Sequence, residues 1–140
     1  MTDKEKLVKY INQLEIYLSH LKKLQKYPRE KFLANWEIYD LADRKLHLVI
    51  ENVLNIGEMI ISEFGFRKPD RYSEIPQILS ENKVIPKKLE KSLVDLAKFR
   101  NVLVHEYVNL DHKKVYQKLK KTPKIIEEFI QVIKEYVKSK

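Results

Sequence analysis

The chain has no cysteine and, among its 140 residues, only two glycines, five prolines and one tryptophan. Without cysteine it cannot form disulfides, use a thiol as a nucleophile or bind zinc through thiolates. The shortage of glycine and proline leaves little material for the tight turns that connect hairpin strands. We therefore expect a helical protein whose chemistry uses other side chains.

Long apolar runs are missing as well. No stretch approaches the roughly 18 apolar residues that a membrane-spanning helix needs, and no basic segment followed by an apolar one opens the chain. We expect a soluble, cytoplasmic protein that has no membrane partner. The length fits a single domain over residues 1–140.

Apolar residues recur every three or four positions along most of the chain, which is the spacing of amphipathic helices. The predicted helices cover residues 3–27, 30–64, 73–79, 86–104, 112–120 and 123–137. Joined by short loops, and with 73–79 only a short helix, these segments predict an all-α, up-and-down bundle of about five helices.

Several residues predict where these helices begin and end. The long helix over 30–64 is expected to break between Asn35 and Asp40 and to end at Gly65. Ser73 and Asp111 are expected N-caps. Thr122 followed by Pro123 is typical of a new helix start; both residues are expected to open the last helix.

Arg100 lies in the middle of an apolar helix face. Its neighbours one turn away are Leu96, Ala97, Leu103 and Val104, so its own helix offers no carboxylate to pair with it. Burying a charge without a partner lowers the stability of the fold by roughly several kcal/mol. Arg100 therefore needs a partner from another helix or chain, an opening to solvent, or an anionic ligand. Candidate partners on the 30–64 helix are Asp40, Asp43, Glu51 and Glu58.

His105 follows Arg100 by five residues, which places it about 140° away around a continuous helix. Either the helix ends near Val104 and the chain turns His105 back, or the two residues meet across a symmetric contact between two chains. An imidazole can move a proton at neutral pH, and arginine binds phosphate through paired donors. Together they could cleave RNA without a metal, the base deprotonating a 2′-hydroxyl and the guanidinium stabilising the phosphorane. The alternative is structural, with an interhelical ion pair and a capping histidine.

The octapeptide RNVLVHEY, residues 100–107, resembles the RX4HXY signature of HepT, the ribonuclease toxin family within the HEPN superfamily. Arg100, His105 and Tyr107 occupy the three defined positions of that signature. The likeness extends to residues 43–66, 71–86 and 108–121.

That resemblance implies a small helical homodimer whose Arg100 and His105 pairs form one composite ribonuclease site at the subunit interface. It implies RNA, such as tRNA, as substrate and no metal or other cofactor. The implied partner is a minimal nucleotidyltransferase antitoxin of the MntA type, which silences the toxin by attaching AMP to Tyr107. Asn101 matches a polar residue that helps to orient the phosphate.

HEPN-like bundles also serve as nucleotide- or substrate-binding subunits of nucleotidyltransferases. In that alternative Arg100 and Tyr107 bind a nucleotide and nothing is cleaved. The net charge of +8 suits a polyanionic partner in both cases. A local group of lysines follows the motif and could contact phosphates: Lys113, Lys114, Lys118, Lys120, Lys121 and Lys124.

The histidines outside the motif show no metal-ligand spacing of the HExxH kind. Asp43 and His47 are four residues apart on a predicted helix, which more often indicates a surface pair than a metal site. The sequence therefore predicts no metal site.

Overall fold

The computed structural model describes residues 2–140, with Tyr107 described through its backbone alone. The elements are α1 (Asp3–Leu24), α2 (Arg29–Ala34), α3 (Trp36–Glu63), α4 (Glu74–Glu81), α5 (Lys87–His105), the short 3-10 helix η1 (Tyr107–Asn109) and α6 (His112–Ser139). All regular structure in this part of the chain is helical, so the all-α prediction is confirmed, with six α-helices where about five were expected.

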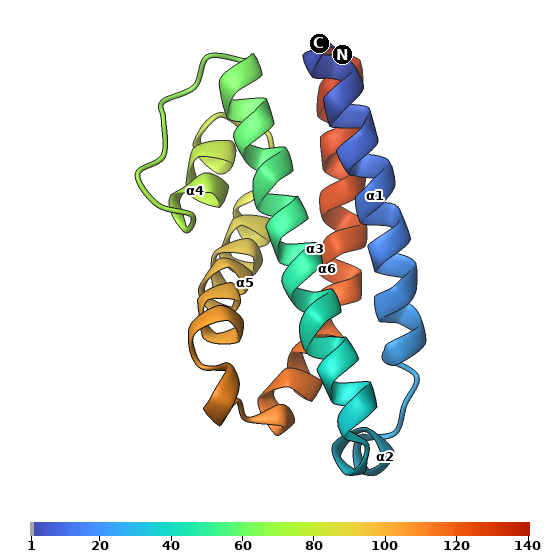
Figure 1. Ribbon diagram of the computed structural model, residues 1–140. Helices are drawn as coiled ribbons and strands as arrows, with labels where there is room; N and C mark the ends of the chain where they lie inside the picture. The colour runs from blue at the N-terminus through green and yellow to red at the C-terminus, as the bar shows by residue number, and fades with distance from the viewer. Residues whose placement is uncertain (1) are drawn as a thin grey trace.

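Three long helices, α1, α3 and α6, run alongside one another, and α4 and α5 lie on the other side of α3 (Figure 1). α3 contacts each of the other five α-helices. The two chain ends lie together at one end of the bundle, and α2 closes the other end (Figure 1). α3 is therefore the element from which polar side chains can reach both α5 and α6.

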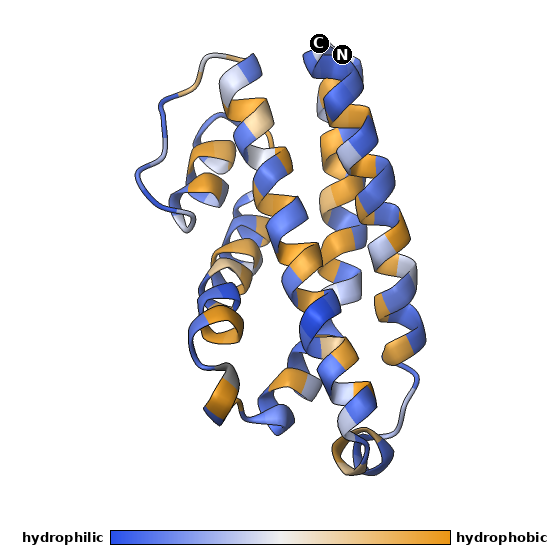
Figure 2. Ribbon diagram, viewed as in Figure 1, coloured by the Kyte–Doolittle hydropathy of each residue, from blue (hydrophilic) through white to orange (hydrophobic). Residues whose placement is uncertain are grey.

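The core consists of the residues that helical periodicity selects. In α1 these are Leu7, Ile11, Leu14, Leu18, Leu21 and Leu24, all buried. Full burial of each such side chain stabilises the fold by about 1.5–3 kcal/mol before conformational entropy is counted. Figure 2 shows the resulting alternation of apolar and polar residues along the long helices. No helix in the described part of the chain is both long and apolar enough to cross a membrane.

The expected break in the 30–64 helix is confirmed at Asn35, which separates α2 from α3. The Asn35 side chain accepts hydrogen bonds from the backbone N–H groups of Glu37 (3.0 Å) and Ile38 (3.4 Å) and so caps α3. The end at Gly65 is confirmed too. Gly65 adopts φ +69°, and the N–H of Phe66 donates to the Ile61 carbonyl at 2.9 Å, which closes the helix with a Schellman turn.

The predicted helix start at Thr122 and Pro123 is wrong, because α6 continues through both residues. The apolar faces on either side of Pro123 lie on one side of the helix and pack into the same core, which favours one continuous helix over two. Proline has no N–H to donate to the carbonyl of Leu119. The neighbouring Lys120 carbonyl accepts a hydrogen bond from the Gln25 side chain at 2.9 Å, and the Lys120 ammonium donates back to the Gln25 carbonyl at 2.9 Å.

Ser73 precedes α4 as expected, but its side chain makes no capping hydrogen bond. Arg67 holds this region instead. Its guanidinium donates to Glu81 at 2.9 Å and 3.0 Å and to Glu74 at 3.3 Å, so it joins the segment after α3 to both ends of α4. Asp111 is confirmed as an N-cap, since its side chain accepts from the Lys113 N–H at 3.0 Å.

Candidate functional site

Arg100 on α5 forms an ion pair with Glu51 on α3. Its Nε donates to Glu51 Oε1, and its Nη1 donates to Asn101 Oδ1 at 3.2 Å. The guanidinium carbon lies 4.8 Å from the centroid of the Tyr72 ring, within the range of a cation–π contact. The partner that Arg100 was predicted to need is therefore a carboxylate from another helix of the same chain.

The pairing with Glu51 does not seal Arg100 from solvent. The side chain is 18% exposed, and a groove begins beside it, lined among others by Asn101 and Tyr72. Three basic and two acidic side chains also line the groove: Lys68, Arg71, Lys98, Glu58 and Asp70. Arg100 itself does not line the groove, but two residues that contact its guanidinium, Tyr72 and Asn101, do.

His47 extends the ion pair along α3. Its Nε2 lies 3.5 Å from Glu51 Oε1, so the Glu51 carboxylate is placed between an imidazole and the Arg100 guanidinium. The interpretation of Asp43 and His47 as a surface pair is wrong, because each binds a different partner. The spacing of His47 and Glu51 by four residues was the sequence signal that could have found this contact.

His105 is the last residue of α5 and is exposed. The helix runs through it, with the Glu106 N–H donating to the Val102 carbonyl at 3.0 Å. α5 therefore ends close to Val104 as one alternative expected, but His105 is itself helical, so the chain does not turn it back toward Arg100. Within one chain, the helix directs His105 about 140° away from Arg100, and the two side chains are not brought together.

Asn101 and Tyr107 are the two remaining predicted site residues. Asn101 is exposed and contacts Arg100 directly. The backbone of Tyr107 begins η1, immediately after α5. The predicted AMP attachment concerns the Tyr107 side chain, which lies outside the described part of the structure.

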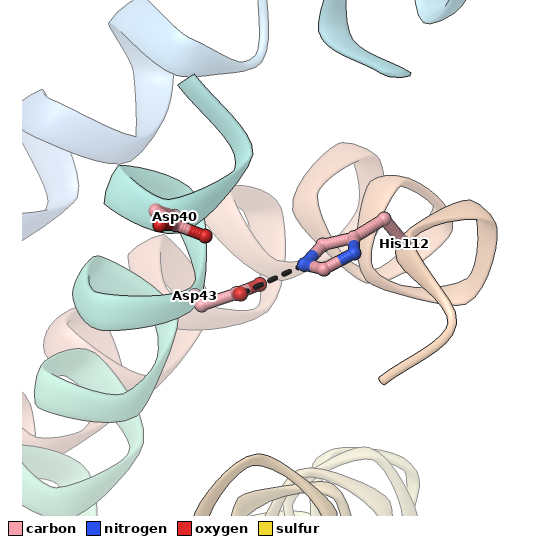
Figure 3. A group of neighbouring side chains, drawn as sticks. All are labelled: Asp40, Asp43 and His112. Carbon is pink, nitrogen blue, oxygen red and sulfur yellow. Dashed lines mark hydrogen bonds and ion pairs between the residues drawn. The ribbon is translucent and has the colours of Figure 1, made fainter. Parts of the chain in front are cut away.

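A second polar cluster lies nearer the start of α3. His112, at the start of α6, forms a 2.8 Å contact from its Nε2 to Asp43 Oδ2, and Asp40 lies beside them (Figure 3). The ring of Tyr39 packs on the His112 ring, with centroids 3.9 Å apart and planes at 30°. Sequence spacing did not reveal this cluster because His112 is 69 residues from Asp43.

The Asp43 side chain is partly buried, with 23% of its surface exposed. Its Oδ1 is buried and has no hydrogen-bond partner within the described residues. Burial raises the pKa of the Asp43 carboxyl; the hydrogen bond with His112 opposes that rise, and the neighbouring Asp40 carboxylate adds to it. The ionised form of Asp43 is thus only partly compensated by its surroundings.

A helical bundle with Arg100, His105 and Tyr107 in and just after the end of α5 is the arrangement expected from the resemblance to HepT-like ribonucleases. The chain belongs to the family described as ribonuclease HepT-like, whose model matches residues 9–133. The predictions of a HepT-like protein and of a ribonuclease are confirmed by this membership.

Individual relatives agree with the family. YutE of Bacillus subtilis, a candidate RNase, is 32% identical over 104 residues, which cover 74% of this chain and 72% of YutE. The tRNA nuclease HepT of Aphanizomenon flos-aquae is 28% identical over 100 residues, covering 71% of this chain and 68% of that protein.

Solved structures show the same fold. The structure of YutE, described as a cytosolic protein, superposes with a TM-score of 0.84 at 27% identity and covers 99% of this chain and 92% of YutE. A tri-AMPylated HEPN toxin from Shewanella oneidensis, in complex with MNT antitoxin, superposes with a TM-score of 0.85 at 21% identity, covering 96% of this chain and 99% of the toxin.

Proposed function

We propose that this protein is the endoribonuclease toxin of a HEPN/minimal-nucleotidyltransferase pair. It acts in the cytoplasm as a homodimer, cleaves RNA such as tRNA without a metal, and is silenced when the antitoxin attaches AMP to Tyr107. The observation that carries the proposal is the environment of Arg100: a fixed, partly exposed guanidinium whose contact residues Tyr72 and Asn101 line a groove with three basic and two acidic side chains.

The contacts of Arg100 leave it able to bind a phosphate. A guanidinium has five N–H donors; within the described residues, Glu51 takes the Nε donor and Asn101 takes one on Nη1. The remaining donors are available to a phosphodiester. Because Glu51 and Tyr72 hold the guanidinium, it needs little reorganisation when charge develops on the phosphorane. Glu51 is in this scheme a positioning residue.

A second copy of the chain would complete the site. His105 and Arg100 diverge around α5, so a two-fold contact between the motif segments is the simple way to bring an imidazole to the scissile phosphate. Val108, the residue directly after the motif, lies in η1 and is 78% exposed. A two-fold contact through this end of the molecule would remove that side chain from water.

His105 and Arg100 have separate roles in the reaction. His105 accepts the proton of the 2′-hydroxyl as that oxygen attacks the neighbouring phosphorus, and the 5′-oxygen leaves and takes up a proton. Arg100 neutralises the negative charge of the phosphorane. AMP on Tyr107 would bring a negative phosphate and a bulky base next to His105, which repels RNA and blocks its path.

Basic residues on α6 supply further contacts for the RNA backbone. Lys113, Lys114, Lys121 and Lys124 are exposed and share one face of the first half of α6. Lys118 and Lys120 are instead engaged with the chain itself, through the Phe99 ring and the Gln25 carbonyl. The four exposed lysines support a sequence-independent, salt-sensitive contribution to RNA binding.

The decisive experiment is the variant His105→Ala. His105 is exposed at a helix end, so its removal should leave the melting temperature within a few degrees of the wild type. We expect it to abolish cleavage of bulk tRNA by the purified protein and growth inhibition in cells. His20→Gln, which changes a histidine on α1, is the matched control and should retain both activities. Undiminished cleavage by His105→Ala would refute the proposed role of the motif.

A second candidate function is a nucleotide- or substrate-binding subunit of a nucleotidyltransferase. The observation that favours it is the separation of His105 from Arg100 within one chain, because binding alone requires only Arg100 and the groove beside it. Purified protein that binds ATP but leaves tRNA intact, with and without divalent metal, would establish this alternative. Cleavage lost in His105→Ala would exclude it.

A further inference from the structure

We propose that Asp40, Asp43 and His112 form a binding site for a first-row divalent metal ion such as Zn²⁺, which joins α3 to the start of α6. Each side chain offers one ligand atom, and the three atoms lie within 4.8 Å of one another. The site lies apart from the ribonuclease motif and is independent of the function proposed for that motif.

The ligand set is that of a transition metal and not only of a hard cation. Imidazole nitrogen suits Zn²⁺, Co²⁺ and Ni²⁺, and two carboxylate oxygens balance the charge of a divalent ion. In a tetrahedral site with ligand distances of about 2.0–2.1 Å, neighbouring ligand atoms are about 3.3 Å apart. The contact between His112 and Asp43 is 2.8 Å and all three ligand atoms lie within 4.8 Å of one another, so an ion would require side-chain rotations that widen the first spacing and close the others.

Two observations show that the cluster is more than a group of surface acids. Asp43 Oδ1 is buried and has no hydrogen-bond partner within the described residues, so an oxygen already removed from water is available to a ligand. The imidazole comes from a different helix and is held by the ring of Tyr39, 3.9 Å away between centroids. Figure 3 shows the His112 ring directed at Asp43, with Asp40 on the adjacent turn of α3.

The two carboxylates also favour binding of a cation. Asp40 and Asp43 are three residues apart on α3 and repel each other when both are ionised, and the contact from α6 to this pair is the His112 imidazole on Asp43. A divalent cation would relieve this repulsion. Because Asp40 is exposed, a fourth ligand position at the ion would be open to water.

Metal binding would cross-link two elements that frame the motif. His112 opens α6, seven residues after His105, and α3 carries Asp43 two turns before Glu51. An ion held by Asp43 and His112 would therefore fix the chain where it returns to the bundle after η1.

Binding can be tested on the full chain after treatment with a chelator. Calorimetric titration with Zn²⁺ should give one ion per chain, and Co²⁺ should produce the visible absorption of a low-symmetry site. His112→Ala and Asp40→Asn should each weaken Zn²⁺ binding by more than about tenfold. His20→Gln removes a different imidazole and should bind as tightly as the wild type.

Asp40→Asn guards against a folding artefact, because Asp40 is exposed and the contact between Asp43 and His112 stays in place. Zn²⁺ should also raise the melting temperature of the wild type and not that of His112→Ala. The proposal is overturned if the wild type binds no Zn²⁺ at micromolar concentration, or if His112→Ala and Asp40→Asn both bind it as the wild type does.

Discussion

The guanidinium of Arg100 on α5 is bonded to the carboxylate of Glu51 on α3, 49 residues earlier in the chain. Both side chains are mostly buried, with 18% and 24% of their surfaces exposed. This ion pair both fastens α5 to the central helix and sets the position of the cation that the proposed chemistry requires.

Replacing Glu51 by Gln should destabilise the fold. The guanidinium would keep its place but lose its charged partner in a poorly solvated site, which we expect to cost about 1–2 kcal/mol. Urea unfolding monitored by circular dichroism measures this directly. Glu58→Gln, an exposed position on the same helix, is the control and should unfold at the wild-type midpoint. Equal midpoints for all three proteins would show that the ion pair contributes no stability.

Inactive chains should complement each other if the ribonuclease site is shared between two copies. Arg100→Ala and His105→Ala each remove one of the two groups. A mixed dimer has one intact Arg100, from the His105→Ala chain, and one intact His105, from the Arg100→Ala chain. Mixing the two variants after dissociation should restore a substantial fraction of tRNA cleavage, whereas each variant alone should stay inactive. No recovery in a mixture that demonstrably forms mixed dimers would contradict a composite site.

Gly57 marks a close approach between α3 and α4. A Cβ added at this position would lie 2.5 Å from Ile75 Cγ2 and 3.4 Å from Leu79 Cδ1. Gly57→Ala gains about 1 kcal/mol of helix propensity but forces a β-branched side chain to move, which costs about 1–3 kcal/mol. We expect a net loss of stability, seen as a lower melting temperature. Glu58→Ala, the exposed neighbouring position, should show none of this loss.

The free energy of unfolding should depend on pH through Asp43, which links α3 to α6 by its contact with His112. Burial raises the pKa of this carboxyl above its ordinary value of 3.8. The folded state therefore binds the proton more tightly than the unfolded chain does. Its stabilising contribution is complete below 3.8 and is lost as the pH rises through the folded-state pKa.

Asp43→Asn removes this titration while keeping the shape of the side chain. In the presence of a chelator, the free energy of unfolding of the wild type should fall relative to that of Asp43→Asn as the pH rises from 4 to 7. Urea titrations at several pH values measure the difference; a constant difference, or one that changes in the opposite direction, would contradict the prediction.

Local sequence determined most of the helical framework. The periodicity of α1 identified its buried face, and Asn35, Gly65 and Asp111 marked helix ends, since capping depends on residues within one turn of each other. The octapeptide around Arg100 identified the family for the same reason: its information lies within eight consecutive residues.

Only the tertiary structure decided which distant side chains meet. Glu51 as partner of Arg100 and His112 as partner of Asp43 depend on how α3, α5 and α6 pack, and several carboxylates along α3 matched equally well by spacing. The continuity of α6 across Pro123 was decided in the same way. Proline and threonine favour a helix start locally, but burial of one apolar face over the whole length of α6 outweighs the lost hydrogen bond.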